Sequence, residues 1–199
     1  MKQQQKPIKL IVVGTSLGGF NALRTILSPL PADFPIPILV VRHHSAQSDD
    51  YLIRVLNQES QLKIQFAEDR DIPAPGNVYI APPDRHLLVS KSGKLKLSAD
   101  KAINFSRPAI DPLFKSAAKL YGSSLLAVVL TGANKDGAKG VVEIKKKGGK
   151  VMVQDPAFAE ADAMPKAALE AVEADYVIWL DQIGPQLWTI TRSNSNKKQ

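Results

Sequence analysis

An apolar run that ends in a glycine-rich turn constrains the fold of this sequence more than any other feature. The run Ile8–Val13 leads into Gly14-Thr15-Ser16-Leu17-Gly18-Gly19, and apolar residues then recur at helical spacing from Ala22 to Leu30. A strand that is buried on both faces, as in a parallel sheet, carries such a nearly continuous apolar run. The stretch therefore predicts a central parallel strand, a tight turn and an amphipathic helix.

The turn places the hydroxyl of Ser16 beyond the carboxyl end of a strand and at the N-terminus of a helix. A helix N-terminus stabilises negative charge, which suits a nucleophile. Gly14, Gly18 and Gly19 are also compatible with a phosphate cradle, although their spacing departs from G-x-G-x-x-G. A third interpretation is a turn without chemistry, in which Ser16 caps the helix. Spacing alone leaves all three open.

Further apolar runs extend the same pattern along the chain. Ile38–Val41 and Leu125–Leu130 predict two more buried parallel strands. Shorter strands are expected at 63–66, 78–80, 150–154 and 176–180, helices at 111–120, 138–147, 165–172 and 185–191, and an antiparallel hairpin at 86–90 and 94–98. Asp111 before Pro112 predicts an N-cap. The fold class is α/β: a doubly wound, mostly parallel three-layer sheet with a short antiparallel hairpin insertion at one edge.

Length and composition limit the domain organisation and the partners. We expect a disordered lead at 1–8, one domain at 9–191 and a polar tail at 192–199. The absence of cysteine excludes disulfides and thiolate metal sites and is compatible with a cytoplasmic location. No apolar run approaches the ~20 residues of a membrane span, so no membrane insertion is expected.

The net charge of +7 favours acidic partners. Part of the excess lies in the lysines at 145–147 and in the tail, and only 6% of residues are aromatic. Nucleic-acid surfaces interleave aromatic residues with basic ones, so we interpret the lysines as a solvated face and expect no nucleic-acid partner.

Each of the three buried strands is followed by a residue with catalytic chemistry: Ser16, then His43 or His44, then Asp136. Carboxyl ends of parallel strands share one sheet edge, so these side chains suit a Ser-His-Asp triad, in which histidine takes the serine proton and the carboxylate fixes the imidazole tautomer. The alternative is that Ser16 and Asp136 only cap helices. His86, at a strand start, is interpreted as a structural histidine.

Six blocks of sequence carry a closer likeness: Gly14–Gly19, Val41-Arg42-His43, Val78–Pro82, Arg107–Phe114, Leu130–Gly132 with Asp136–Ala138, and Met164-Pro165. With these blocks in order from about Lys9 to Thr191, the sequence closely resembles the catalytic domain of CheB-type protein-glutamate methylesterases. The resemblance implies that residues 9–191 are a methylesterase catalytic domain.

The resemblance also implies roles and partners. It assigns the nucleophile to Ser16, the base to His43, the orienting carboxylate to Asp136, and an oxyanion hole to the backbone N–H groups of Ala133 and Leu17. The implied reaction is hydrolysis of glutamate methyl esters on the cytoplasmic helices of chemotaxis receptors, which releases methanol, with glutamine deamidation as a second activity and no cofactor. The family usually carries an N-terminal receiver domain, and none precedes Lys9, so we expect either an excised fragment or a stand-alone form with other regulation, for which a separate regulatory or receiver protein is the expected partner.

Several positions depart from the family's pattern. Leu17 follows the nucleophile where Thr or Ala is usual, His44 adds a second histidine after His43, and Ala133 and Asn134 replace a methionine and a glycine. The predicted substrate-pocket residues are Thr15, Arg42, His44 and Asn134.

Other functions remain as alternatives. A nucleotide-binding α/β protein would use the Gly14–Gly19 turn for phosphates, with Arg42 near a 2′-phosphate. A catalytically weak receptor-docking module would keep the fold and tolerate loss of Ser16. A metal site from His43, His44, Asp49 and Asp50 lacks a helical i, i+4 pair or a third histidine nearby, so no metal is expected.

Overall fold

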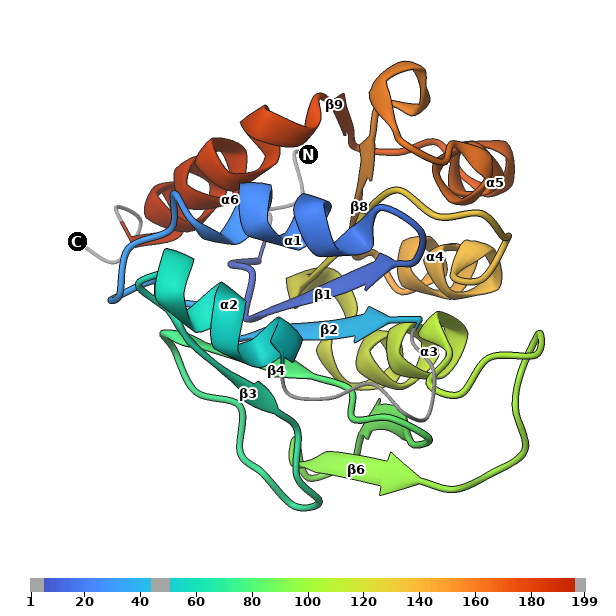
Figure 1. Ribbon diagram of the computed structural model, residues 1–199, viewed down its shortest axis with the longest axis horizontal. Coiled ribbons are helices and arrows are strands. Elements are labelled where there is room, and N and C mark those ends of the chain that lie inside the picture. The colour runs from blue at the N-terminus through green and yellow to red at the C-terminus, as the bar shows by residue number, and fades with distance from the viewer. Residues whose placement is uncertain (1–5, 44–50, 196–199) are drawn as a thin grey trace.

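The computed structural model describes residues 6–43 and 51–195. Seven strands form one sheet in the order β3-β4-β2-β1-β7-β8-β9, and every neighbouring pair is parallel (Figure 1). Their bounds are β1 Leu10–Thr15, β2 Ile38–Arg42, β3 Lys63–Phe66, β4 Asn77–Ile80, β7 Leu125–Val129, β8 Lys150–Gln154 and β9 Tyr176–Ile178. The three strongest apolar runs thus lie side by side as β2, β1 and β7, which confirms the predicted parallel core.

Helices cover both faces of the sheet and complete the predicted three layers (Figure 1). One face carries α1 Gly19–Leu27, α2 Tyr51–Glu59 and α6 Leu180–Ser195, and the other carries α3 Ile110–Tyr121, α4 Ala138–Lys146 and α5 Ala163–Ala171. Short 3₁₀ turns lie at Gly122–Ser124 and Pro156–Phe158. Side chains that alternate along β1 divide between the two cores, because successive strand residues point to opposite faces.

The predicted antiparallel hairpin is present as β5 His86–Val89 and β6 Leu95–Ser98. It forms a two-stranded sheet of its own rather than another strand of the main sheet. Leu87, Val89 and Leu95 are buried in the core that also contains the apolar face of α3. The hairpin therefore packs against α3.

Strand β1 continues through Gly14 and Thr15, two residues beyond its predicted end. Gly14 pairs with Val41 on one side and Val129 on the other. A Cβ at this position would lie 2.6 Å from Cγ2 of Ile110, which is closer than carbon atoms pack. Glycine lets the strand pass beneath α3, so the turn begins only at Ser16.

Helix α6 is longer than the sequence predicted at both ends. It begins at Leu180, before Pro185, because the buried Ile183 and Leu187 give one apolar face to residues on both sides of the proline. A proline in the second turn removes only one early hydrogen bond. The helix also continues to Ser195, into the predicted polar tail, while Ile8 of the predicted lead is buried in the core.

Among the described residues, no helix combines the length and the apolar character that a membrane crossing requires.

Candidate active site

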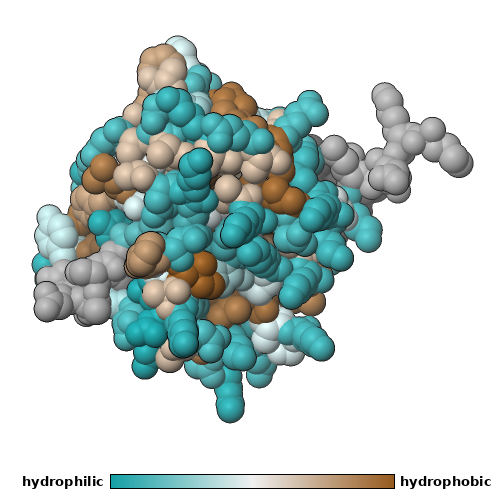
Figure 2. Space-filling view, turned by 90° about the vertical axis from the view of Figure 1, so that its right-hand side faces the viewer, coloured by the Kyte–Doolittle hydropathy of each residue, from teal (hydrophilic) through white to brown (hydrophobic). Residues whose placement is uncertain are grey.

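The carboxyl ends of β1, β2 and β7 meet at one edge of the sheet, as the triad hypothesis requires. The His43 N–H donates to the Thr15 carbonyl at 3.1 Å, and the Ser16 N–H donates to the Thr131 carbonyl at 3.0 Å. The loops after the three strands are therefore fixed to one another by backbone hydrogen bonds. Figure 2 shows this side of the molecule, where hydrophilic and hydrophobic side chains are mixed on the surface.

Thr15 does not line a pocket, contrary to the prediction. Its side chain is fully buried, and its hydroxyl donates to the Thr131 carbonyl at 2.9 Å. The Thr131 hydroxyl donates in turn to the Leu17 carbonyl at 2.9 Å, and the Thr131 N–H donates to Oε1 of buried Gln154 at 2.9 Å. The sequence did not predict that Thr131 and Gln154 hold the loops of the site together through hydrogen bonds. The one sequence feature that could have indicated this role is that each is a polar residue at the end of a buried strand.

His43 and Asp136 form the polar pair expected of a catalytic site. Nε2 of His43 lies 2.8 Å from Oδ2 of Asp136, and the two side chains are 11% and 0% exposed. A carboxylate only accepts hydrogen bonds, so Nε2 carries the proton. Asp136 does not cap its own helix: α4 has Gly137 as its N-cap without a side-chain capping bond, and the Asp136 Oδ1 accepts the N–H of Gly137, which precedes the helix.

Asp136 remains anionic although it is buried. Burial by itself would raise the pKa of this carboxyl, but the hydrogen bond from His43 and the backbone N–H groups of Ile110 and Asp111 outweigh burial and lower the pKa. Those N–H groups donate at 2.6 and 3.2 Å and belong to the N-terminus of α3. The helix dipole points its positive end at the carboxylate.

Asp111 is not the N-cap that the sequence predicted. Helix α3 begins at Ile110 after Ala109, and the Asp111 carboxylate instead accepts the Gly140 N–H in the first turn of α4 at 2.6 Å. The reason is that the distant Asp136 already caps α3, which leaves Asp111 free to point toward α4. Burial raises the pKa of Asp111, and the nearby charge of Asp136 raises it further.

The other ring nitrogen of His43 contacts Asn134. Nδ2 of Asn134 lies 3.2 Å from Nδ1 of His43, and the half-buried Ser16 follows the neighbouring strand. Among the described residues, the Ser16 hydroxyl makes no hydrogen bond with His43. Asn134, predicted as a pocket residue, therefore occupies the nitrogen that faces away from Asp136.

The two predicted oxyanion donors lie in the loops that follow β1 and β7. Neither the Leu17 N–H nor the Ala133 N–H donates to any other group of the part of the chain that the structure describes. Both are in turns, outside helices and strands. Two backbone donors without an internal partner beside a serine could stabilise an oxyanion.

The remaining candidate residues differ in environment. Nε of Arg42 is buried without a hydrogen-bond partner among the described residues, and burial lowers the pKa of its guanidinium. His44 lies outside the described residues, as do Asp49 and Asp50 of the metal alternative. His86 is buried and has partners at both ring nitrogens, Ala109 N–H and the Lys101 carbonyl, so the prediction of a structural histidine is confirmed.

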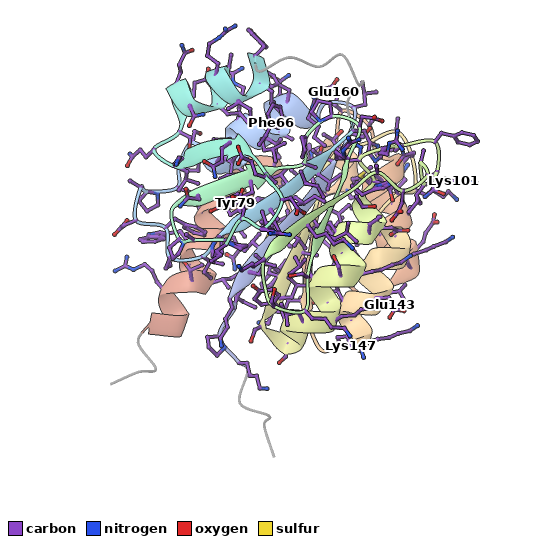
Figure 3. All side chains as sticks on the ribbon, turned by 90° about the horizontal axis from the view of Figure 1, so that it is seen from below. Phe66, Tyr79, Lys101, Glu143, Lys147 and Glu160 are labelled. Atoms are coloured by element: carbon purple, nitrogen blue, oxygen red, sulfur yellow. The ribbon has the colours of Figure 1, made fainter. Side chains whose placement is uncertain are left out.

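The basic cluster at 145–147 lies away from this centre. Helix α4 starts beside Asp136 and extends about 13 Å over its nine residues, at 1.5 Å per residue. Figure 3 shows Glu143 and Lys147 toward one end of the molecule and Glu160 toward the other. Lys145 pairs with Asp175, and Lys146 pairs with Glu143. These charges form a solvated face rather than a rim of the site.

Comparison with known proteins identifies the family. The family model described as CheB methylesterase matches residues 11–187, which is most of the chain. The chain belongs to the CheB methylesterase family. It is 44% identical over 188 residues to a putative protein-glutamate methylesterase/protein-glutamine glutaminase of Leptospira interrogans, covering 94% of this chain and 97% of that protein.

Further CheB relatives agree with this membership. The crystal structure of the Thermotoga maritima CheB methylesterase catalytic domain superposes with a TM-score of 0.88 at 39% identity, covering 92% of this chain and 98% of that one. A protein-glutamate methylesterase/protein-glutamine glutaminase of Pseudomonas putida is 38% identical over 92% of this chain but only 50% of its own length. The chain therefore corresponds to the CheB catalytic domain in fold and extent.

Proposed function

We propose that this chain is a protein-glutamate methylesterase in which Ser16 is the nucleophile, His43 the general base and Asp136 the orienting carboxylate. The substrates are glutamate γ-methyl esters on the cytoplasmic helices of chemotaxis receptors, and the products are free carboxylates and methanol. The observation that carries the proposal is the buried His43–Asp136 pair beside a serine loop that is bonded to the same two strand ends.

The first half-reaction forms an acyl-enzyme. The Ser16 hydroxyl attacks the ester carbonyl as Nδ1 of His43 takes its proton, because Nε2 already carries a proton that is donated to Asp136. The carbonyl oxygen becomes an oxyanion, which the N–H groups of Leu17 and Ala133 stabilise. When the tetrahedral intermediate collapses, the C–O bond to the methoxy group breaks, and His43 gives its proton to the departing methanol.

The second half-reaction restores the enzyme. A water molecule attacks the acyl carbonyl, His43 takes the water proton, and Ser16 leaves with that proton, which frees the glutamate carboxylate. The same steps applied to a glutamine side chain release ammonia, so we include glutamine deamidation in the proposal. General-base assistance of this kind contributes about 10²–10⁴ in rate.

Methanol release from a methylated receptor fragment tests the proposal. We expect Ser16→Ala and His43→Ala to abolish nearly all release, because each removes one step of the acyl transfer. His44→Ala is the matched control and should retain most activity, since Asp136 already pairs with His43. A dominant loss in His44→Ala would assign the base to the neighbouring histidine instead.

Receptor binding separates an esterase from a docking module. Ser16→Ala should bind the methylated fragment as the unmodified protein does while it releases no methanol. If methanol release by the unmodified protein is also absent and binding is retained, the chain acts as a docking module.

We further propose a cytoplasmic location and a separate regulatory or receiver protein as a partner.

The structure offers little support for nucleotide binding at the Gly14–Gly19 turn. A Cβ built on Gly18 would lie 2.6 Å from Oε2 of Glu160, so a carboxylate lies directly against the turn. A negative charge at that position opposes a phosphate group. Titration with NADPH should therefore show no saturable binding.

A further inference from the structure

Asn134 contacts both members of the polar pair. Its Oδ1 accepts the Asp136 N–H at 3.0 Å, and its Nδ2 lies 3.2 Å from Nδ1 of His43. A backbone N–H can only donate, so the amide oxygen must face Asp136, and the amide NH₂ must face His43. The orientation of the Asn134 amide is thereby fixed by its own hydrogen bonds.

This orientation agrees with the protonation of the imidazole that Asp136 imposes. An NH₂ group only donates, so Nδ1 of His43 must accept and carries no proton. The carboxylate of Asp136 only accepts, so Nε2 of His43 must donate. One short loop, 134–136, therefore holds the ring at both nitrogens.

We propose that Asn134 is a positioning residue that holds the His43 ring through Nδ1, in the orientation needed for catalysis, and yields Nδ1 to the Ser16 hydroxyl when substrate binds. This inference rests on the proposed role of His43 as general base. Nδ1 is the only ring nitrogen that does not face Asp136, so it must be the atom that takes the serine proton. The Asn134 amide leaves Nδ1 unprotonated and holds the ring in place until the Ser16 hydroxyl replaces it as the donor.

The side chain at this position matters because only a hydrogen-bond donor there can contact the unprotonated Nδ1 of His43. A glycine at this position has no side chain and cannot donate to the histidine. In this chain, the amide adds a second support to a base that is otherwise held only by Asp136. The group that contacts Nδ1 is a hydrogen-bond donor, which favours an unprotonated Nδ1. Replacing that donor with an acceptor should therefore favour a proton on Nδ1.

Asn134→Asp makes that exchange without a change of shape. One carboxylate oxygen keeps the Asp136 N–H, and the other faces Nδ1 of His43 and favours a proton on it. We expect ¹⁵N NMR of labelled histidine at neutral pH to show His43 protonated at Nε2 alone in the unmodified protein and at both ring nitrogens in this variant, because Asp136 still accepts from Nε2. With its lone pair occupied, His43 should lose its function as a base, and kcat for methanol release should fall at least ~100-fold with KM within about threefold.

Asn134→Gly is the matched control. It removes the donor without supplying an acceptor, so His43 should remain protonated at Nε2 through Asp136, and kcat should stay within ~10-fold. The Nδ1 resonance should move away from the protonated range because it loses a donor. This second variant also tests the contact if Asn134→Asp does not fold.

The outcomes distinguish the inference from the proposed function. If neither variant changes the His43 resonances, Asn134 does not contact Nδ1, and the inference is overturned. If Asn134→Asp adds a proton at Nδ1 but turnover is unchanged, the contact between residue 134 and Nδ1 holds, and the role of His43 as the base is overturned instead.

Discussion

The carboxylate of Asp111 accepts the backbone N–H of Gly140 at 2.6 Å, so the first turn of α3 caps the first turn of α4. The capping is reciprocal, because Asp136, which precedes α4, accepts N–H groups from the start of α3. The N-terminal N–H groups of α3 thus donate to the carboxylate that precedes α4, and an N–H of the first turn of α4 donates to a carboxylate in the first turn of α3. The arrangement fixes the carboxylate that lies 2.8 Å from Nε2 of His43.

Loss of the Asp111 carboxylate should destabilise the fold. In Asp111→Ala, the buried Gly140 N–H keeps no partner, which costs about 1–3 kcal/mol of the free energy of unfolding. Urea unfolding followed by circular dichroism measures this change. Asp33→Ala is the control, since Asp33 is exposed and should change stability by no more than ~0.5 kcal/mol. Equal effects of the two substitutions would contradict the reciprocal capping.

The lowered pKa of Asp136 predicts a loss of stability in acid. A carboxyl whose pKa is lower in the folded state stabilises the fold above its ordinary range, and that stability is lost as the pH falls through the folded pKa. Asp136→Asn should be less stable than the unmodified protein at pH 6, and the difference should shrink below about pH 4. Urea midpoints from pH 2.5 to 6 provide the test, and parallel curves would exclude this contribution.

Asp111 should show the opposite dependence. Its pKa is raised, so the folded state holds its proton at pH values where the unfolded chain has released it. Its contribution therefore falls as the pH rises through and above its ordinary range, about 4. Asp111→Asn, which keeps an oxygen for Gly140, should lose less stability than the unmodified protein between pH 4 and 7. A steeper loss in the variant would show that the carboxyl titrates in the opposite sense.

Asp136→Asn should also impair catalysis much more than folding. An asparagine amide can donate to Nε2 of His43, which moves the proton to Nδ1 and leaves no acceptor for the Ser16 hydroxyl. We expect kcat for methanol release to fall about 10⁴-fold, as for other triads with this change. Asp162→Asn changes an aspartate that pairs with Lys166 outside this centre and should leave kcat unaltered. Retention of most activity by Asp136→Asn would mean that this carboxylate does not orient the base.

Gly14→Ala tests the close approach of β1 and α3. The added methyl would meet Ile110 at 2.6 Å, and overpacking of this kind costs about 1–3 kcal/mol. The shift should also reduce esterase activity, because Ile110 donates its N–H to Asp136. The double variant Gly14→Ala with Ile110→Ala should be less destabilised than the sum of the two single variants. If the losses of unfolding free energy in the two single variants add up to the loss in the double variant, residues 14 and 110 do not overlap sterically.

Much of the fold followed from local patterns in the sequence. The runs at 8–13, 38–41 and 125–130 predicted β1, β2 and β7, because burial on both faces requires continuous apolar residues. Element ends were less predictable. Gly14 looked like a turn residue yet lies within β1, and Pro185 looked like a helix start yet lies inside α6, since packing against α3 and α1 decided both.

The order of the chain was thus enough to place Ser16, His43 and Asp136 at the ends of buried strands, because strand periodicity and turn chemistry act between near neighbours. Only the tertiary structure decided which polar groups meet. Thr15 became a buried support, Asp111 reached Gly140 across 29 positions, and Asn134 reached His43 across 91. A buried polar group needs a hydrogen-bond partner. Which residue becomes that partner depends on how the fold brings distant segments together, and no local sequence pattern contains this information.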